Sequence, residues 1–332
     1  MSLLDDAIAK GAKLAGVRGR YAPSPTGPLH LGNVRTALLA WLQVRLVGGT
    51  LIMRMEDLDG PRVVEGSAEQ ILQDLRWLGL DWEEGPDVGG PVGPYTQSER
   101  DDFYQEALER LQQKGLIFPC FCSRKDIRQA ASAPHAEDGS PLYPGTCRGL
   151  DKQGIEQMRK KKKRRAAYRF NVQQQAPVTF ADAICGEVEE DLVADVGDFV
   201  VKRRDGLFAY QLAVVVDDIA MGVTDVVRGE DLLTSTARQI AIYRALGAKV
   251  PRFWHVPLML GEDGERLSKR DGSRSIAELR DEHGASPSEI VAKLSKSLGI
   301  DCGEEVSASE LLAALRGKDL ATLLGACGIP SL

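Results

Sequence analysis

The chain has 332 residues, of which 43% are hydrophobic and 27% charged, a composition typical of folded proteins that bury a sizeable core. Its formal net charge of −6 excludes a protein that is basic throughout, although a local basic face could still contact nucleic acid. Six cysteines in a chain of this length do not indicate a secreted disulfide framework, and no apolar run is long enough to span a bilayer, so we expect a cytoplasmic protein without a membrane segment.

The first predicted elements surround a loop rich in proline and glycine. A strand is expected over residues 16–20, before the loop. After it, an amphipathic helix is expected, because large residues recur on one side at helical spacing: Val34, Leu38, Trp41, Leu42 and Arg45. Gly48 and Gly49 would end this helix, and a second strand is expected over residues 50–56.

The start of this helix is a candidate phosphate site. Helix N-termini present unpaired N–H groups and a positive dipole end, both of which favour phosphate. His30 and Asn33 flank the helix start, where their side chains could donate to phosphate oxygens. The alternative is a proline-stiffened loop in which Asn33 caps the helix and His30 faces solvent.

Glu56 lies at the end of the second predicted strand. Ligands of parallel sheets bind outside the carboxyl ends of the strands, so Glu56 could receive a positive group such as the ammonium of an amino acid. The alternative is a solvated acidic turn before Gly60. One helix is expected over residues 67–79, and a second is expected to end at Lys114.

Three cysteines follow these helices in a pattern typical of a metal site: Cys120, Cys122 and Cys147. Zinc takes about four ligands in a tetrahedron, normally thiolates and imidazoles, so three cysteines are one ligand short. His135 and Tyr143 lie between the cysteines, and general ligand chemistry favours His135 as the fourth. The alternative is a set of three buried or free thiols.

The strongest charge run is RKKKKRR, residues 159–165. It is either a solvated basic face or a candidate phosphate contact, which would contribute affinity and salt dependence rather than sequence choice. After this run, strands are expected to begin at residues 168–170 and to continue through residues 178–191, in a region inserted between the two halves of the predicted sheet.

The region around residues 207–227 indicates a second half of the same sheet. The contiguous valines 214–216 could belong to a buried strand or a buried helix. A strand over residues 221–227 would place Arg228 at its end, where a guanidinium can hold a carboxylate with two parallel hydrogen bonds. The alternative for Arg228 is a salt bridge to Glu230 or Asp231.

The remaining chain contains one more strand and a helical tail. A helix is expected over residues 235–247 and a strand over residues 253–260. His255, near the start of this strand, is interpreted as a packed histidine without a catalytic proton. A basic loop follows between Gly264 and Gly272, and residues 275–332 are expected to be helical with breaks at glycine and proline.

Two stretches together resemble the nucleotide-binding signatures of class I aminoacyl-tRNA synthetases. His30-Leu31-Gly32-Asn33 is similar to the first signature, usually His-Ile-Gly-His, and Arg266-Leu267-Ser268-Lys269-Arg270 to the second, usually Lys-Met-Ser-Lys-Ser. The longer string RYAPSPTGPLHLGN resembles the glutamyl branch, whereas a glutaminyl enzyme would be expected to carry Glu-Pro-Asn in place of Ser-Pro-Thr. Asn33 and Arg270 depart from the usual signatures, but both keep a hydrogen-bond donor.

The resemblance implies an α/β fold, namely a Rossmann-like class I synthetase catalytic domain with an inserted zinc-containing subdomain and a short helical C-terminal tail. The nucleotide-binding domain would comprise residues 1–117 and 206–274. The insertion would comprise residues 118–205, and the tail residues 275–332, with no anticodon-binding domain.

The resemblance also implies the ligands and the residues that hold them. Glutamate would be bound by residues of both halves: Arg20, Tyr21, Ala22, Pro23, Ser24, Glu56, Tyr210 and Arg228. ATP, accompanied by Mg²⁺, would be bound by the two signatures: His30, Gly32, Asn33, Ser268 and Lys269. Catalysis would rest on Lys269, His30 and Asn33. Some short glutamyl-synthetase relatives bind one structural zinc through Cys-x-Cys followed by Tyr-x-x-x-Cys, which implies Cys120, Cys122, Tyr143 and Cys147.

About sixty residues follow Asp271, too few for the anticodon-binding domains of a full glutamyl-tRNA synthetase. The resemblance therefore implies a short member of the family, which activates L-glutamate without tRNA and joins it to the queuosine base in the anticodon stem-loop of tRNA(Asp). Two alternatives remain, a minimal glutamyl-tRNA synthetase that charges a tRNA 3′ end and a non-catalytic tRNA-binding paralogue. Intact Arg20, Glu56, Arg228 and Lys269 favour an enzyme, which we expect to act as a monomer.

Overall fold

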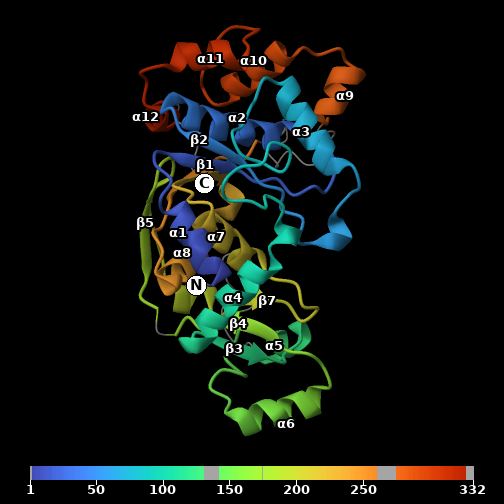
Figure 1. The fold of residues 1–332 in the computed structure, drawn as a ribbon, viewed down its shortest axis with the longest axis vertical. Coiled ribbons are helices and arrows are strands. Elements are labelled where there is room, and N and C mark those ends of the chain that lie inside the picture. The colour runs from blue at the N-terminus through green and yellow to red at the C-terminus, as the bar shows by residue number, and fades with distance from the viewer. Residues whose placement is uncertain (1, 131–141, 174, 260–273, 327–332) are drawn as a thin grey trace.

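Two β-sheets organise the computed structural model, which describes residues 2–130, 142–173, 175–259 and 274–326 (Figure 1). The larger sheet has six strands in this spatial order: β2 (Thr50–Met53), β1 (Arg18–Tyr21), β8 (Asp225–Gly229), β9 (Arg252–Val256), β5 (Val178–Asp182) and β6 (Gly186–Glu190). All its neighbouring pairs are parallel except the β5–β6 hairpin. The carboxyl ends of β2, β1, β8 and β9 therefore meet along one edge of the sheet, where ligands of parallel sheets bind.

Helices cover both faces of this sheet, because neighbouring strand residues point to opposite sides. Leu51, Val227 and Trp254 pack into one hydrophobic core, and the adjacent residues Ile52, Val226 and Phe253 pack into the other. The first core is covered by α2 (Leu31–Leu46), α3 (Ser67–Trp77) and the C-terminal helices α9 (Ile276–Asp281), α10 (Pro287–Ser297), α11 (Ala308–Leu315) and α12 (Leu320–Ala326). The second is covered by α1 (Leu3–Gly11), α4 (Asp101–Gln113), α7 (Tyr210–Ala220) and α8 (Thr236–Leu246).

Helix α2 differs from its prediction in one respect. Val34, Leu38, Trp41 and Leu42, which are predicted to face a core, are buried, but so are Leu39, Ala40 and Val44 on other sides of the helix. The prediction of an amphipathic helix is therefore wrong, because its middle is buried on all sides, and α10 and α11 contact it in addition to the sheet. Gly48, at φ +65°, follows the helix as expected of a residue that ends it.

The smaller sheet is antiparallel and consists of β3 (Ile117–Cys120), β4 (Ala167–Phe170) and β7 (Phe199–Lys202). Beside it lie α5 (Arg124–Ala130) and α6 (Lys152–Lys162), and Figure 1 shows α6 at the end of the molecule opposite α9–α12. The strands expected within residues 178–191 form the β5–β6 hairpin, which pairs with the larger sheet through β9 rather than with these strands.

Other element types agree with expectation, but their ends differ. The valines at 214–216 belong to helix α7, so the strand expected from residue 221 begins only at Asp225. The strand expected over residues 50–56 ends at Met53, and the one expected over 253–260 ends at Val256. Short helical segments complete the connections: η1 (Gly60–Arg62), η2 (Gln97–Glu99), η3 (Leu192–Val196) and η4 (Glu230–Ser235). Within the described ranges, no helix has the length and apolar character needed to cross a membrane.

Candidate functional site

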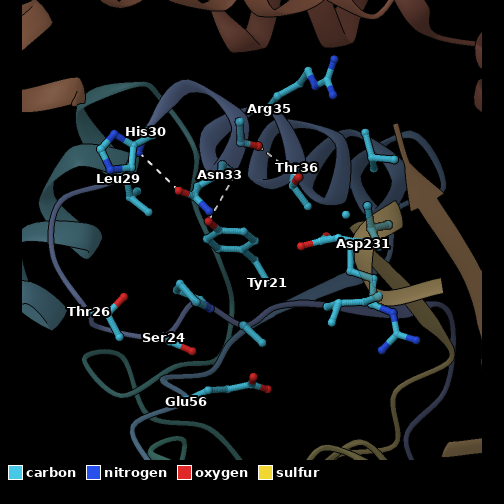
Figure 2. Close-up of a pocket in the computed structure, with 18 of the residues that line it drawn as sticks. Tyr21, Ser24, Thr26, Leu29, His30, Asn33, Arg35, Thr36, Glu56 and Asp231 are labelled. Atoms are coloured by element: carbon cyan, nitrogen blue, oxygen red, sulfur yellow. Dashed lines mark hydrogen bonds between the residues drawn. The ribbon is translucent and has the colours of Figure 1, made fainter. Parts of the chain in front are cut away.

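A cavity of about 870 Å³ opens at the carboxyl edge of the larger sheet (Figure 2). Strands β1 and β8 run side by side and in parallel, so Arg20 and Arg228 reach this edge together, and Glu56 follows the end of β2. Every predicted glutamate or ATP ligand within the described ranges lines the cavity: Arg20, Tyr21, Ala22, Pro23, Ser24, His30, Gly32, Asn33, Glu56, Tyr210 and Arg228. Ser268 and Lys269 lie outside the described residues, as does His135.

Arg228 is buried and held by neutral groups. Its Nε donates to His255 Nε2 at 3.0 Å, and its two terminal nitrogens donate to Gln239 Oε1 at 2.8 Å and Thr236 Oγ1 at 2.7 Å. Tyr210 Oη accepts a longer bond of 3.4 Å. The sequence alternative of a salt bridge to Glu230 or Asp231 is wrong, since no carboxylate of the described residues lies within ion-pair distance of Arg228. Burial lowers the pKa of the Arg228 guanidinium, so this site favours the arrival of an anion.

The orientation of Arg228 depends on two residues whose role the sequence does not reveal. His255 stands opposite Arg228 in the β8–β9 register, and its Nδ1 lies 2.6 Å from Asp182 Oδ2. Because the Arg228 Nε–H can only donate, His255 Nε2 must accept, and the proton on Nδ1 is donated to Asp182. Burial lowers the pKa of His255, which agrees with a neutral ring. His255 is thus a packed histidine, as predicted, but one that positions Arg228.

Arg20 and Glu56 lie near each other in the cavity. The Arg20 guanidinium donates to the backbone oxygen of Val227 at 3.0 Å, and its Nε lies 3.6 Å from Asp218. Glu56 accepts from Arg54 at 2.9 Å. Burial raises the pKa of the Glu56 carboxyl, although the charges of Arg54 and Arg20 oppose that shift. The acidic turn proposed as an alternative is therefore wrong, because Glu56 is enclosed between cations rather than solvated.

The start of α2 forms the opposite wall, as Figure 2 shows. Asn33 Oδ1 accepts from the backbone N–H of His30 at 3.4 Å, so the amide oxygen caps the helix and only the amide NH₂ group can donate to a ligand. Tyr21 Oη donates to the backbone oxygen of Asn33 at 3.2 Å, which fixes the helix start against β1. A Cβ added at Gly32 would meet no atom of the described residues within 4 Å, because that position faces open space.

The three predicted metal-ligand cysteines lie together. The Sγ atoms of Cys120, Cys122 and Cys147 are buried and within 4.8 Å of one another. Tyr143 Oη lies 3.4 Å from Cys120 Sγ and 3.9 Å from Cys122 Sγ. Four donors this close fit a tetrahedral site, because Zn–S bonds of about 2.3 Å place sulfurs nearly 4 Å apart. The hydrogen bond with Cys147 lowers the pKa of the Cys120 thiol, which favours its thiolate form. The cluster is consistent with a zinc site.

Comparisons with known proteins identify the family. Residues 16–311 match the family of class I tRNA synthetases (E and Q), catalytic domain. Glutamyl-Q tRNA(Asp) synthetase of Symbiobacterium thermophilum is 52% identical over 89% of this chain and 90% of its own length. Glutamate–tRNA ligase 1 of Halorhodospira halophila is 46% identical over 79% of this chain, which spans 55% of that relative.

A solved structure shares the fold. The crystal structure of glutamate-tRNA synthetase from Elizabethkingia anophelis superposes with a TM-score of 0.77 at 32% identity, covering 90% of this chain. The chain spans 65% of the length of that protein. With the parallel sheet and the buried cysteine cluster, this likeness confirms the predicted Rossmann-like class I fold. The chain therefore belongs to the class I tRNA synthetases for glutamate and glutamine, and within them to the glutamyl-Q tRNA(Asp) synthetases.

Proposed function

We propose that this chain uses ATP to activate L-glutamate as glutamyl-adenylate and then transfers the glutamyl group to queuosine in the anticodon of tRNA(Asp). The observation that carries the glutamate assignment is the buried Arg228, which has no carboxylate partner among the described residues and faces a cavity shared with Arg20 and Glu56. Family membership supports ATP and tRNA as the other substrates.

The charges of the cavity match those of glutamate. The amino acid carries two carboxylates and one ammonium, and among the charged groups that line the cavity are the guanidinium groups of Arg20 and Arg228 and the carboxylate of Glu56. We assign one substrate carboxylate each to Arg20 and Arg228, and the ammonium to Glu56. The Tyr210 hydroxyl and the segment Tyr21–Ser24 would complete the walls of this pocket. The buried surroundings strengthen these interactions, because charges attract more strongly at low dielectric constant.

ATP would lie against the start of α2. The free N–H groups of the first helical turn, the His30 ring and the Asn33 amide would donate to its phosphates, and Gly32 would leave room for close approach. Ser268 and Lys269 are assigned to the same phosphates from the sequence, and Mg²⁺ would accompany ATP. These donors act by neutralising charge on the phosphates and by holding the reactants in line.

The reaction needs no covalent group of the enzyme. A carboxylate oxygen of glutamate attacks the α-phosphorus of ATP, the bond to the β-phosphate oxygen breaks, and pyrophosphate leaves with the electron pair. A nucleophilic group of queuosine then attacks the acyl carbon, loses its proton, and displaces AMP. Positive charge from Lys269 would stabilise the α-phosphate during the first step.

We propose that the cysteine cluster binds one structural zinc through Cys120, Cys122, Cys147 and the Tyr143 hydroxyl. The thiols would release their protons to water when the metal binds, and the bound ion would join the segments that carry these four residues. The cluster has no part in the reaction itself, because its residues do not line the cavity.

A minimal glutamyl-tRNA synthetase is the second candidate, favoured by the 46% identity to the Halorhodospira halophila ligase. It would use the same glutamate and ATP sites and would differ only in the tRNA atom that receives the glutamyl group. The non-catalytic alternative is disfavoured, because Arg20, Glu56 and Arg228 converge on one cavity.

Replacing Gly32 with valine is expected to block ATP binding without unfolding the protein. The added Cβ meets no atom within 4 Å in the part of the chain that the structure describes, so the side chain would project into the space assigned to ATP. In glutamate-dependent ATP–pyrophosphate exchange, we expect KM for ATP to rise about tenfold or more, the equivalent of about 1.4 kcal/mol. The melting temperature should stay nearly unchanged, and Gly32→Ala should have a smaller effect. An unchanged KM for ATP in Gly32→Val would show that ATP does not bind against this wall of the cavity.

A further inference from the structure

Helix α6 and the residues after it carry a cluster of exposed cations in a chain of net charge −6. We define the basic surface as the exposed side chains Arg159, Lys160, Lys161, Lys163 and Arg165. It lies at the end of the molecule opposite α9–α12 (Figure 1). None of its residues lines the glutamate and ATP cavity, so the chemistry proposed above leaves this surface without a role.

The basic surface encloses a shallow hollow of about 350 Å³. Four cations line it, and no carboxylate does: Arg159, Lys163, Arg164 and Arg165. Lys163 and Arg165 make no ion pair among the described residues, and Arg159 has only a long contact of 3.8 Å to Glu156. Cations crowded in this way repel one another unless an anion lies between them.

The backbone reinforces this arrangement. Lys163 has φ +49°, the only positive φ at a residue other than glycine in the described ranges. A left-handed conformation costs energy for a side chain with a Cβ, and glycine or asparagine would be cheaper at this helix end. The chain instead places a lysine there, beside the hollow.

The rest of the chain holds the basic surface in place. Ile155 and Met158, the apolar residues of α6, pack against the core that contains the cysteine cluster. Asp126 of α5 pairs with Lys162 at 2.8 Å and with Arg164 at 3.6 Å. The same carboxylate accepts from the backbone N–H of Ser123 at 2.6 Å, one residue after Cys122. The cations therefore sit on a fixed scaffold rather than on a loose chain.

We propose that the basic surface binds consecutive backbone phosphates of the tRNA substrate, an inference that rests on the function proposed above. Phosphates along an RNA strand match clustered cations around a hollow that no carboxylate lines. An anionic lipid surface fits less well, because membrane-surface helices expose an apolar face, whereas the apolar side of α6 faces the cysteine cluster. The contacts would fix the position of the tRNA and contribute salt-dependent affinity without reading its sequence.

The test compares two triple variants in binding to tRNA(Asp). Lys161→Gln/Lys163→Gln/Arg165→Gln removes three charges of the basic surface. Lys249→Gln/Lys293→Gln/Lys318→Gln removes three exposed charges elsewhere and serves as the control. At about 0.1 M salt we expect the first variant to bind tRNA about tenfold or more weakly. Its plot of log Kd against log salt should lose a slope of about 2, at roughly 0.7 per phosphate contact.

Two further readouts separate this inference from the proposed function. Glutamate-dependent ATP–pyrophosphate exchange without tRNA should be equal in both variants and the wild type. If the wild-type protein shows no exchange, the proposed function is contradicted, whereas the tRNA-binding role of the basic surface is not. Equal tRNA affinity and salt slope in the two variants would overturn the inference. So would unchanged tRNA binding combined with loss of binding to phosphatidylserine vesicles, which would assign the surface to a membrane.

Discussion

Replacing Arg228 with glutamine is expected to lower kcat/KM for glutamate about 100-fold or more in ATP–pyrophosphate exchange. Glutamine keeps a polar side chain in the buried position but removes the charge and the planar fork that would hold a substrate carboxylate. Removing one partner of a desolvated charge pair costs about 2–5 kcal/mol, and each 1.4 kcal/mol corresponds to a factor of ten. We expect most of the loss in KM for glutamate, with KM for ATP changed little.

Two other variants make this result specific. Arg228→Lys keeps the charge but not the fork, so it should recover only part of the activity. Arg244→Gln removes an exposed arginine from the same strand–helix region, on α8, and should behave like the wild type. If kcat/KM for glutamate in Arg228→Gln stays within about threefold of the wild type, Arg228 does not bind the substrate carboxylate.

Replacing Arg54 with methionine is expected to reduce the free energy of unfolding by about 3–5 kcal/mol. The Arg54 side chain is fully buried, and it donates to Asp218 at 2.7 Å and to Glu56 at 2.9 Å. Burial opposes its charge, yet the nearby carboxylates Asp218, Glu56 and Asp217 raise the pKa of the guanidinium well above its usual value. Without Arg54, these carboxylates would remain buried with too little compensating charge.

The matched control is Arg203→Met. Arg203 also pairs with two carboxylates, Asp205 at 2.6 Å and Asp59 at 3.3 Å, but its side chain is 45% exposed. Solvent screens such pairs, so this variant should lose no more than about 1 kcal/mol. Urea unfolding of both variants at neutral pH measures the difference. Equal losses in the two would show that the buried pairs of Arg54 contribute no more than surface ones.

Much of the site could be predicted because its residues occupy strand ends and a helix start. Glu56 and Arg228 lie at the ends of apolar strand patterns, and Gly32 and Asn33 begin a helix. Local sequence is therefore enough to place these residues at the carboxyl edge of the sheet. The cysteine cluster was predictable from spacing, and the structure brings Cys120, Cys122 and Cys147 together as expected.

The groups that orient these residues could not be predicted in the same way. Asp182 is 73 positions from His255, and only the pairing of β5 with β9 brings the two side chains together. Likewise, the sequence gives Arg54 no distinguishing feature, and its ion pairs with Asp217 and Asp218 form only because helix α7 packs beside it. The burial of α2 on all sides depends on α10 and α11, more than 240 positions away. Local patterns carry no information about such distant contacts.

The most direct test of the proposed function is transfer of labelled glutamate to tRNA(Asp) prepared with and without queuosine, followed by nuclease cleavage to locate the label. We predict label on the anticodon fragment, only when queuosine is present, and after activation that needs glutamate and ATP but no tRNA. Label on the 3′ end of tRNA(Glu), with none on the anticodon fragment of tRNA(Asp), would contradict this account and make the chain a minimal glutamyl-tRNA synthetase.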